Sequence, residues 1–329
     1  MIKLIRTVLC ATILSVGAVA IPSAASAQDL PKVDIVVFTP PSLGAFLVPI
    51  VKQRKFDTKN GININFVQRS TDAYISEFNS GEFQVGGSAS LLSVAVASSR
   101  GVKVAYLFNL FDYFGAVVTD HPDIKTVKDL EGKKLVAAAS TTNFAMFKWL
   151  AMNQGVDVSR ISVQNTSTPG LVGYALADRA DAVQLWEPGY SILLNKKPSM
   201  RTLDLKIGQS WKKFAGTEHI PYLGVAAHLD WIKKNPELVN KMYATFKDAA
   251  DWLRANPEEG GKMIAASIKG SDPAVIIDLI KNNVRLGLNV DTAGDMEKGI
   301  RAVYAAGHKI GYLTKEVSES TIYKGIKTK

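Results

Sequence analysis

The feature that most constrains the fold is a twice-repeated alternation of short apolar segments with segments of helical periodicity. It runs through residues 33–107 and again through 135–185. Alternation of this kind predicts parallel sheets covered by helices on both faces. We expect strands near 33–38, 62–66, 83–86, 102–107, 135–138, 161–164 and 182–185, and helices near 42–54, 72–79, 89–99, 142–153 and 168–178. The last third is mostly helical, and two blocks predict two sheets and hence two lobes.

The first 27 residues have the pattern of a secretory signal. Lys3 and Arg6 precede a mostly apolar run, residues 8–21, and residues 25–27 match the A-x-A cleavage rule. The run is too short to span a bilayer, and Cys10 lies inside it rather than at a lipoprotein cleavage site. We therefore expect export to the periplasm, without a lipid anchor, and a mature chain of about 300 residues.

Composition excludes several classes of function. The formal net charge of +9 falls to +7 when the two basic residues of the signal are removed, and the remaining basic residues are scattered. This pattern does not predict a nucleic-acid partner. The mature chain would contain no cysteine, which excludes disulfides and thiol catalysis. The four histidines lie far apart, and no phosphate loop or nucleophile elbow occurs, so we predict no metal, no cofactor and no enzyme activity.

Three predicted strand-to-helix junctions share small or hydroxylic residues. They are Pro40-Pro41-Ser42, Gly86-Gly87-Ser88 and the segment 139–142, which contains Ser140, Thr141 and Thr142. Ligands of open α/β sheets bind beyond the carboxyl ends of the strands, where helix N-termini offer free N–H groups. Glycines such as Gly87 would also let a ligand approach the backbone. Each hydroxyl could instead serve only as a helix cap.

Four further residues could face a ligand. Trp186 and Glu187 end a predicted strand, where the ring could pack on a ligand and the carboxylate could accept hydrogen bonds. The alternative is a Trp that plugs the base of a cleft beside a solvated Glu. Arg69 could clamp an anion or face solvent. Asp112, within an aromatic stretch between the two blocks, could line a cleft or form a turn.

Four segments together resemble the periplasmic solute-binding proteins of ABC importers for nitrate, sulfonates and taurine. Their sequences, in chain order, are LGAFLVPIVKQRKFDTKNGININF, SGEFQVGGSAS, TVKDLEGKKLVAAASTTNF and LADRADAVQLWEPGY. The resemblance covers residues 33–265. It implies a type II, two-lobed Venus-flytrap fold, with residues 28–114 and 224–329 in lobe one and 115–223 in lobe two. The chain would cross between lobes near 112–116 and 218–223, and hinge closure would enclose the ligand.

The resemblance also implies which residues face the cleft and which partners are needed. With the residues discussed above, the candidate ligand-binding set is Ser42, Leu43, Arg69, Gly87, Ser88, Asp112, Ser140, Thr141, Thr142, Trp186 and Glu187. The implied partners are a small-molecule ligand and a membrane permease with its ATPase, and we expect a monomer. The hydroxyl cluster 140–142 would thus cap a helix and also contact ligand.

Two departures from the family pattern leave the ligand open. Asn143 stands where taurine-type members carry His after the hydroxyl cluster, and Glu187 follows the Trp where they often lack an acid. A carboxylate near the cleft disfavours a bare anion unless the ligand also carries a donor or a positive charge. An amino-sulfonate, a carboxylate or a nitrogen heterocycle would fit. Two alternative functions use the same cleft, namely a thiamine-pyrimidine synthase-like enzyme and a ligand-presenting sensor subunit.

Overall fold

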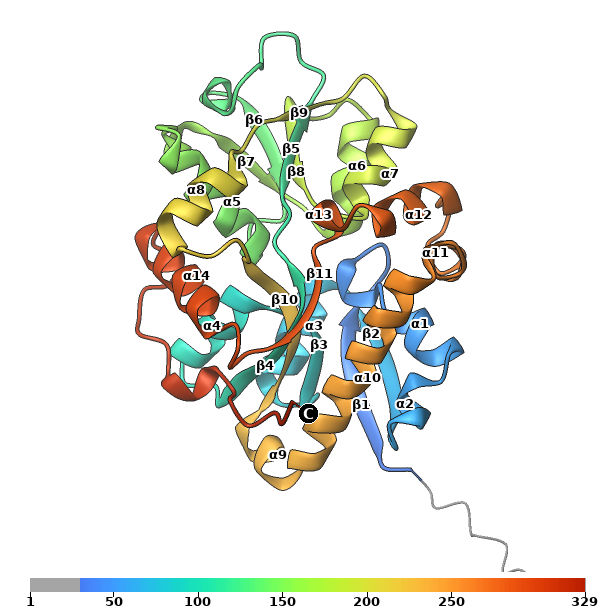
Figure 1. The fold of residues 1–329 in the computed structure, drawn as a ribbon. Helices are drawn as coiled ribbons and strands as arrows, with labels where there is room; N and C mark the ends of the chain where they lie inside the picture. The colour runs from blue at the N-terminus through green and yellow to red at the C-terminus, as the bar shows by residue number, and fades with distance from the viewer. Residues whose placement is uncertain (1–29, 329) are drawn as a thin grey trace, which may run out of the picture.

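The protein is described by a computed structural model that covers residues 30–328 of the 329. The secretory signal predicted for residues 1–27 lies outside the described residues. Within them, no helix is both long and apolar enough to cross a membrane. Figure 1 shows two lobes stacked on one another, each built around one β-sheet.

The first lobe contains a six-stranded mixed sheet with the order β11–β4–β10–β3–β1–β2. Strands β1, β2 and β3 run parallel, whereas β10 is antiparallel to β3 and β4, and β11 is antiparallel to β4. The strands are β1 (Lys32–Phe38), β2 (Asn63–Arg69), β3 (Val85–Ser90), β4 (Val104–Asp112), β10 (Pro221–His228) and β11 (Leu288–Thr292). This sheet therefore joins two stretches of chain that the second lobe separates.

The second lobe contains a five-stranded mixed sheet with the order β7–β6–β8–β5–β9. Strand β6 is parallel to β7 and β8, and β5 is antiparallel to β8 and β9. The strands are β5 (Ala116–Thr119), β6 (Lys134–Ala137), β7 (Ser162–Asn165), β8 (Ala182–Leu185) and β9 (Arg201–Leu203). All five come from one continuous stretch of chain.

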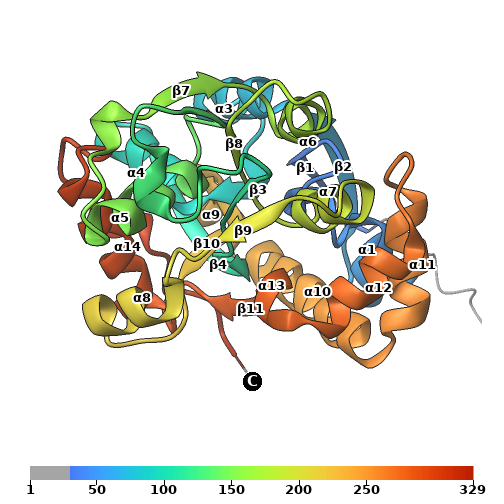
Figure 2. The same cartoon turned by 90° about the horizontal axis from the view of Figure 1, so that it is seen from above.

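Helices cover both faces of each sheet, as Figures 1 and 2 show. On the first sheet, α10 packs against β4 and β11 beside α1 and α2, and α4 and α14 lie on the other side. On the second, α5 and α6 lie on opposite sides of β8. The helices are α1 (Val48–Gln53), α2 (Phe56–Lys59), α3 (Thr71–Ser80), α4 (Leu91–Ser99), α5 (Thr142–Asn153), α6 (Thr168–Leu176), α7 (Gly189–Lys196), α8 (Ile207–Ala215), α9 (Leu229–Lys234), α10 (Pro236–Ala255), α11 (Pro257–Ala266), α12 (Pro273–Lys281), α13 (Asn283–Leu286) and α14 (Glu297–Lys309).

The predicted two-lobed α/β fold is confirmed, but the sheets are mixed rather than mostly parallel. The prediction omitted β5, β9, β10 and β11, which make all the antiparallel pairs. Strands β5 and β9 have four and three residues, too few to show a period. Strand β10 is buried on both faces over seven of its eight residues, so its sequence does not alternate between apolar and polar.

The single helix predicted for residues 42–54 is wrong. A 3₁₀ turn, Leu43–Ala45, is capped by Ser42, and α1 then begins at Val48 with Pro49 in its first turn. Proline lacks the N–H that a continuing helix needs and fits the first turn of a new one. The predicted helix is therefore divided into a 3₁₀ turn and a short α-helix.

The loop predicted at residues 86–88 is also wrong, because these residues lie inside β3. A Cβ atom on Gly87 would lie 2.7 Å from the Ile35 side chain and 3.0 Å from that of Val37. The glycine thus permits close packing of β1 side chains against β3 instead of an approach by a ligand. The strand ends only at Ser90, where α4 follows.

The chain passes between the lobes at two places. Three residues, 113–115, connect β4 of the first sheet to β5 of the second. Residues 204–220, which include α8, lead from β9 back to β10. The boundaries given above for the two lobes, residues 28–114 with 224–329 and residues 115–223, stay a prediction.

Candidate functional site

The carboxyl ends of β2, β6 and β7 meet at a cavity of about 90 Å³ between the lobes. A water molecule in the liquid occupies about 30 Å³, so this interlobe crevice has room for a small polar head group. Three of the lining residues follow β2 in the first lobe, and five follow β6 and β7 in the second. They are Ser70, Thr71, Asp72, Ala138, Ser140, Asn165, Thr166 and Ser167.

Three helices begin at the interlobe crevice. Helix α3 has Ser70 as its N-cap, whose Oγ accepts a hydrogen bond from the N–H of Ala73 at 3.4 Å. Helix α5 begins at Thr142, two residues after Ser140, and α6 has Ser167 as its N-cap, with no capping bond from that side chain. Helix N-termini carry a partial positive charge and free N–H groups, so their convergence favours an anionic group.

The side chains of the interlobe crevice are neutral with one exception. Asp72 is the one carboxylate among the eight lining residues, and the same eight include no Lys, Arg or His. Asp72 is exposed and lies in the first turn of α3. An anion here would be bound by hydroxyls and helix ends, and Asp72 would select solutes that also carry a donor.

The three residues of the hydroxyl cluster 140–142 make different contacts. Thr141 is the N-cap of α5 and accepts from the N–H of Phe144 at 3.2 Å. Thr142 is fully buried, and its Oγ1 accepts from the N–H of Leu92 in the first lobe at 3.0 Å. Ser140 is exposed at the crevice, and its carbonyl accepts from the Tyr312 hydroxyl at 2.6 Å. Thr141 thus caps the helix, Thr142 and the Ser140 carbonyl bond to the first lobe, and Ser140 also lines the cavity.

Four predicted site residues of the first lobe lie in its packed interior rather than on the crevice. The N–H of Phe38 donates to Ser88 Oγ at 2.8 Å, and the N–H of Gly44 donates to Ser42 Oγ at 3.2 Å. A Cβ on Gly44 would lie 1.9 Å from Ser88 Oγ, so the 3₁₀ turn sits directly on β3. The four residues, all buried, are Ser42, Leu43, Gly87 and Ser88.

Arg69 and Asp112 are each occupied by other protein groups. Arg69 Nε donates to both carboxylate oxygens of Glu77, at 2.9 and 2.7 Å, so its charge is already paired. Asp112 lies 2.7 Å from His219 Nδ1 and accepts from the amide of Asn289 at 3.1 Å. Burial raises the pKa of Asp112, and the bond to His219 opposes that shift. Neither side chain lines the crevice.

Trp186 and Glu187 are buried at a second contact between the lobes. Glu187 is 0% exposed, and its carboxylate accepts from the Ser191 N–H at 3.1 Å and hydroxyl at 2.8 Å. Arg285 of α13 donates to Ser191 Oγ at 3.2 Å, lies 3.8 Å from Glu187 and pairs with Asp278 at 2.6 Å. Burial raises the pKa of Glu187, while its bonds to Ser191 and the charge of Arg285 act against the rise. We call Glu187, Ser191, Asp278 and Arg285 the interlobe latch.

The sequence reasoning missed two segments that line the crevice, Ser70–Asp72 and Asn165–Ser167. Both follow predicted strands and precede predicted helices, and both contain hydroxyl groups. Hydroxyl groups between a strand and a helix were the signal used at three junctions. The same signal is present at these two junctions. The interlobe role of Arg285 had no signal in the sequence, because the two halves of the latch are far apart along the chain.

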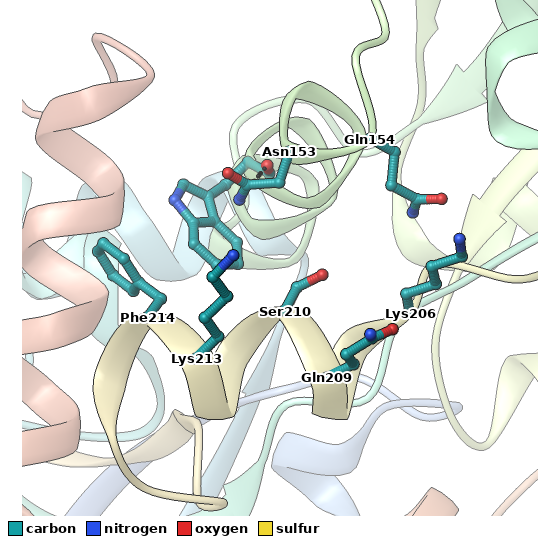
Figure 3. Close-up of a pocket in the computed structure, with 8 residues that line it drawn as sticks. Asn153, Gln154, Lys206, Gln209, Ser210, Lys213 and Phe214 are labelled. Carbon is teal, nitrogen blue, oxygen red and sulfur yellow. Dashed lines mark hydrogen bonds between the residues drawn. The ribbon is translucent and has the colours of Figure 1, made fainter.

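A larger groove of about 560 Å³ lies between the end of α5 and α8 (Figure 3). Figure 3 shows the amides of Asn153 and Gln154 facing Lys206, Ser210 and Lys213 across it. No predicted site residue lines this groove, and it lies away from the carboxyl ends of the strands. Within residues 30–328, no three His, Cys, Asp or Glu side chains gather as a metal site would require.

Comparisons with known proteins agree with the two-lobed α/β fold. A family model described as "NMT1/THI5 like" matches residues 50–260, and no curated protein matches the chain. One similar structure is the alkanesulfonate-binding protein SsuA from Xanthomonas axonopodis pv. citri, solved with MOPS bound. It is 17% identical to this chain and superposes with a TM-score of 0.71, and the alignment covers 90% of this chain and 97% of SsuA. The aliphatic sulphonate binding protein SsuA from Escherichia coli is 18% identical, with coverages of 90% and 98% and a TM-score of 0.71.

A third similar structure comes from Candida albicans. The CA3427 gene product, described as having the generic periplasmic binding protein fold, is 14% identical, with coverages of 89% and 94% and a TM-score of 0.62. Identities this low carry the fold and nothing finer. The chain therefore has the periplasmic binding protein fold, with two α/β lobes.

Proposed function

The chain belongs to the NMT1/THI5-like family, and from this premise we propose that it is the solute-binding component of an ABC importer. It would act in the periplasm, take up a small polar or anionic organic solute between its lobes, and deliver it to a membrane permease with its ATPase. It would work as a monomer and without catalysis.

The observation that carries this proposal is the composition of the interlobe crevice. Hydroxyl-bearing segments from both lobes line one small cavity, and three helices begin there. A solute in this position would bond to Ser70 and Thr71 of one lobe and to Ser140 and Ser167 of the other. Contacts of that kind form only when the lobes are together, so binding favours closure over opening.

The charges around the crevice narrow the class of solute. Helix N-termini and hydroxyls favour a sulfonate or carboxylate head group. Glu187 does not require a donor on the solute, because its carboxylate is buried and bonded to Ser191. Asp72 instead favours a solute that carries a hydrogen-bond donor, because its carboxylate is exposed and lines the cavity. We propose an organic anion, with an amine or hydroxyl group placed where Asp72 can accept a hydrogen bond.

The test is thermal unfolding of the protein against a panel of solutes. The panel contains taurine, alkanesulfonates, nitrate, bicarbonate, carboxylates and pyrimidines. A solute at 100 times its dissociation constant stabilises the folded state by about 2.7 kcal/mol, which moves the unfolding midpoint visibly. We expect a shift with sulfonates or carboxylates. A shift with pyrimidines alone, or with none of the panel, would contradict the proposed solute class.

The same experiment separates binding from the two alternative functions. The solute that shifts the midpoint is incubated with the protein and recovered, and mass spectrometry shows whether it is chemically unchanged. A synthase-like enzyme would alter it, whereas a binding protein would not. A ligand-presenting sensor would also return it unchanged, and uptake of the labelled solute by cells that lack the protein separates sensing from transport.

A further inference from the structure

A buried polar cluster surrounds the short linker 113–115 between the lobes. Asn143, in the first turn of α5, is fully buried, and its Nδ2 donates to the carbonyl of Phe114 at 3.2 Å. Gln184 of β8 is also fully buried and donates through Nε2 to Asn143 Oδ1. The residue at position 143, which departs from the STTH pattern of taurine-type members, thus anchors the linker and does not line the crevice.

Two polar atoms of this cluster have no hydrogen-bond partner among the described residues. They are the Tyr113 hydroxyl and Gln184 Oε1. Tyr113 is 6% exposed, and its hydroxyl lies close to both Gly115 and Asn143, since a Cβ on Gly115 would be 2.1 Å from that hydroxyl and 3.1 Å from Asn143 Oδ1. A buried donor without a partner loses its water without compensation, so this arrangement carries a free-energy cost.

The groups around the Tyr113 hydroxyl come from both lobes. The ring of Tyr222 in β10 meets the Tyr113 ring edge to face at 5.9 Å, and Asn143 approaches from α5. Direct bonds hold the lobes together nearby, such as the one between Thr142 and Leu92 at 3.0 Å. A movement of α5 away from β4 and β10 would expose the hydroxyl to water. The free-energy cost of burying this hydroxyl therefore arises when the lobes touch.

We propose that Tyr113 is a positioning residue whose unpaired hydroxyl disfavours the closed arrangement and so keeps part of the ligand-free protein open for loading. The inference rests on the proposed function, in which solute binding closes the lobes, but its test needs no solute. A protein that is closed when empty would admit solute slowly, so a modest penalty on closure serves uptake. Removal of the hydroxyl alone should release that penalty.

The experiment measures the separation of the lobes by a pair of spin labels. Cys10 is the single cysteine of the chain and is replaced by Ser. Labels are then attached through Ala177→Cys and Ala255→Cys, two exposed positions that follow α6 and end α10. Pulsed electron resonance gives the populations with the lobes touching and apart. Tyr113→Phe removes the hydroxyl and keeps the ring. Tyr304→Phe is the matched control, because the Tyr304 hydroxyl on α14 is also buried and has no hydrogen-bond partner within residues 30–328.

We expect Tyr113→Phe to raise the ratio of closed to open protein at least about fivefold, which corresponds to the lower end of the cost of an unpaired buried group, about 1 kcal/mol. Tyr304→Phe should leave the ratio unchanged. An unchanged or lower ratio in Tyr113→Phe, an equal rise in Tyr304→Phe, or a parent protein with no open population would overturn the proposal. Unfolding midpoints of both variants check that they are folded. A failure of the solute panel would leave this result unaffected.

Discussion

The interlobe crevice and the interlobe latch are both polar contacts between the same two lobes, but they treat their polar groups in opposite ways. In the latch, the Glu187 carboxylate is fully buried, accepts two hydrogen bonds from Ser191 and faces Arg285. In the crevice, Ser140 and Ser167 are exposed, and their side chains cap no backbone group. The polar groups of the latch bond to one another, whereas the hydroxyls of the crevice stay at the surface.

This difference shows that a polar residue between two lobes is not a ligand contact by virtue of its position alone. A carboxylate whose oxygens are already bonded and buried cannot exchange partners without a large desolvation cost. Exposed hydroxyls beside free helix ends can exchange water for solute at little cost. The predictions below test this contrast, beginning with the largest effect.

Breaking the latch should have the largest effect on stability. Arg285→Ala leaves the Glu187 carboxylate buried without its cation, and we expect a loss of about 3 kcal/mol in the free energy of unfolding. Urea unfolding measures it. Asp278→Asn is the control, because Asp278 is 72% exposed and an exposed ion pair contributes about 0.5 kcal/mol. A loss below 1 kcal/mol in Arg285→Ala would show that the latch does not hold the lobes together.

Removing hydroxyls from the crevice should affect binding and leave stability nearly unchanged. A hydrogen bond to a charged group contributes about 1.5–3 kcal/mol, so the double variant Ser140→Ala/Ser167→Ala should bind an anionic solute at least about tenfold more weakly. Calorimetry with the solute identified by the panel measures the affinity. Ser162→Ala, at the opposite end of β7, is the matched control. Equal affinities in the double variant and the control would remove the crevice as the site.

Changing the charge of the crevice should have the smallest effect. Asp72→Asn removes one exposed carboxylate, so a purely anionic solute should bind about two- to fivefold more tightly at low salt. An amino-sulfonate should instead bind more weakly, because its amine loses an acceptor. The control is Glu82→Gln, an exposed acid of the first lobe outside the crevice. No change with either solute would show that Asp72 does not take part in recognition.

The local chemistry of strands and helix ends was sufficient to predict much of the fold. The bounds predicted for α5, residues 142–153, and for β8, residues 182–185, agree with the structure. A helix cap and a short apolar run between turns are local signals, and they do not depend on distant contacts. The family resemblance then supplied the arrangement of the lobes, which no local signal contains.

The site was less predictable, because the same local pattern serves different contacts. Ser88 and Ser140 both follow small residues near the end of a strand, but Ser88 lies inside β3 and accepts from Phe38, whereas Ser140 is exposed at the crevice. The difference depends on whether the strand continues past the small residues. Strand β3 does continue, and Ile35 and Val37 pack closely against it at Gly87. Packing between segments is not visible in either segment alone.

The order of the strands in the first sheet also determines the order in which the lobes can form. All strands of the second sheet lie between Ala116 and Leu203, so this sheet is complete when that stretch has emerged. The first sheet needs β10 and β11, and the segment after α14 adds a backbone bond from Tyr323 to Tyr106 of β4 at 3.1 Å. During synthesis from the N-terminus, the first lobe thus begins first and is completed last, because β3 and β4 pair with β10, and β4 with β11, only after these later strands have been made.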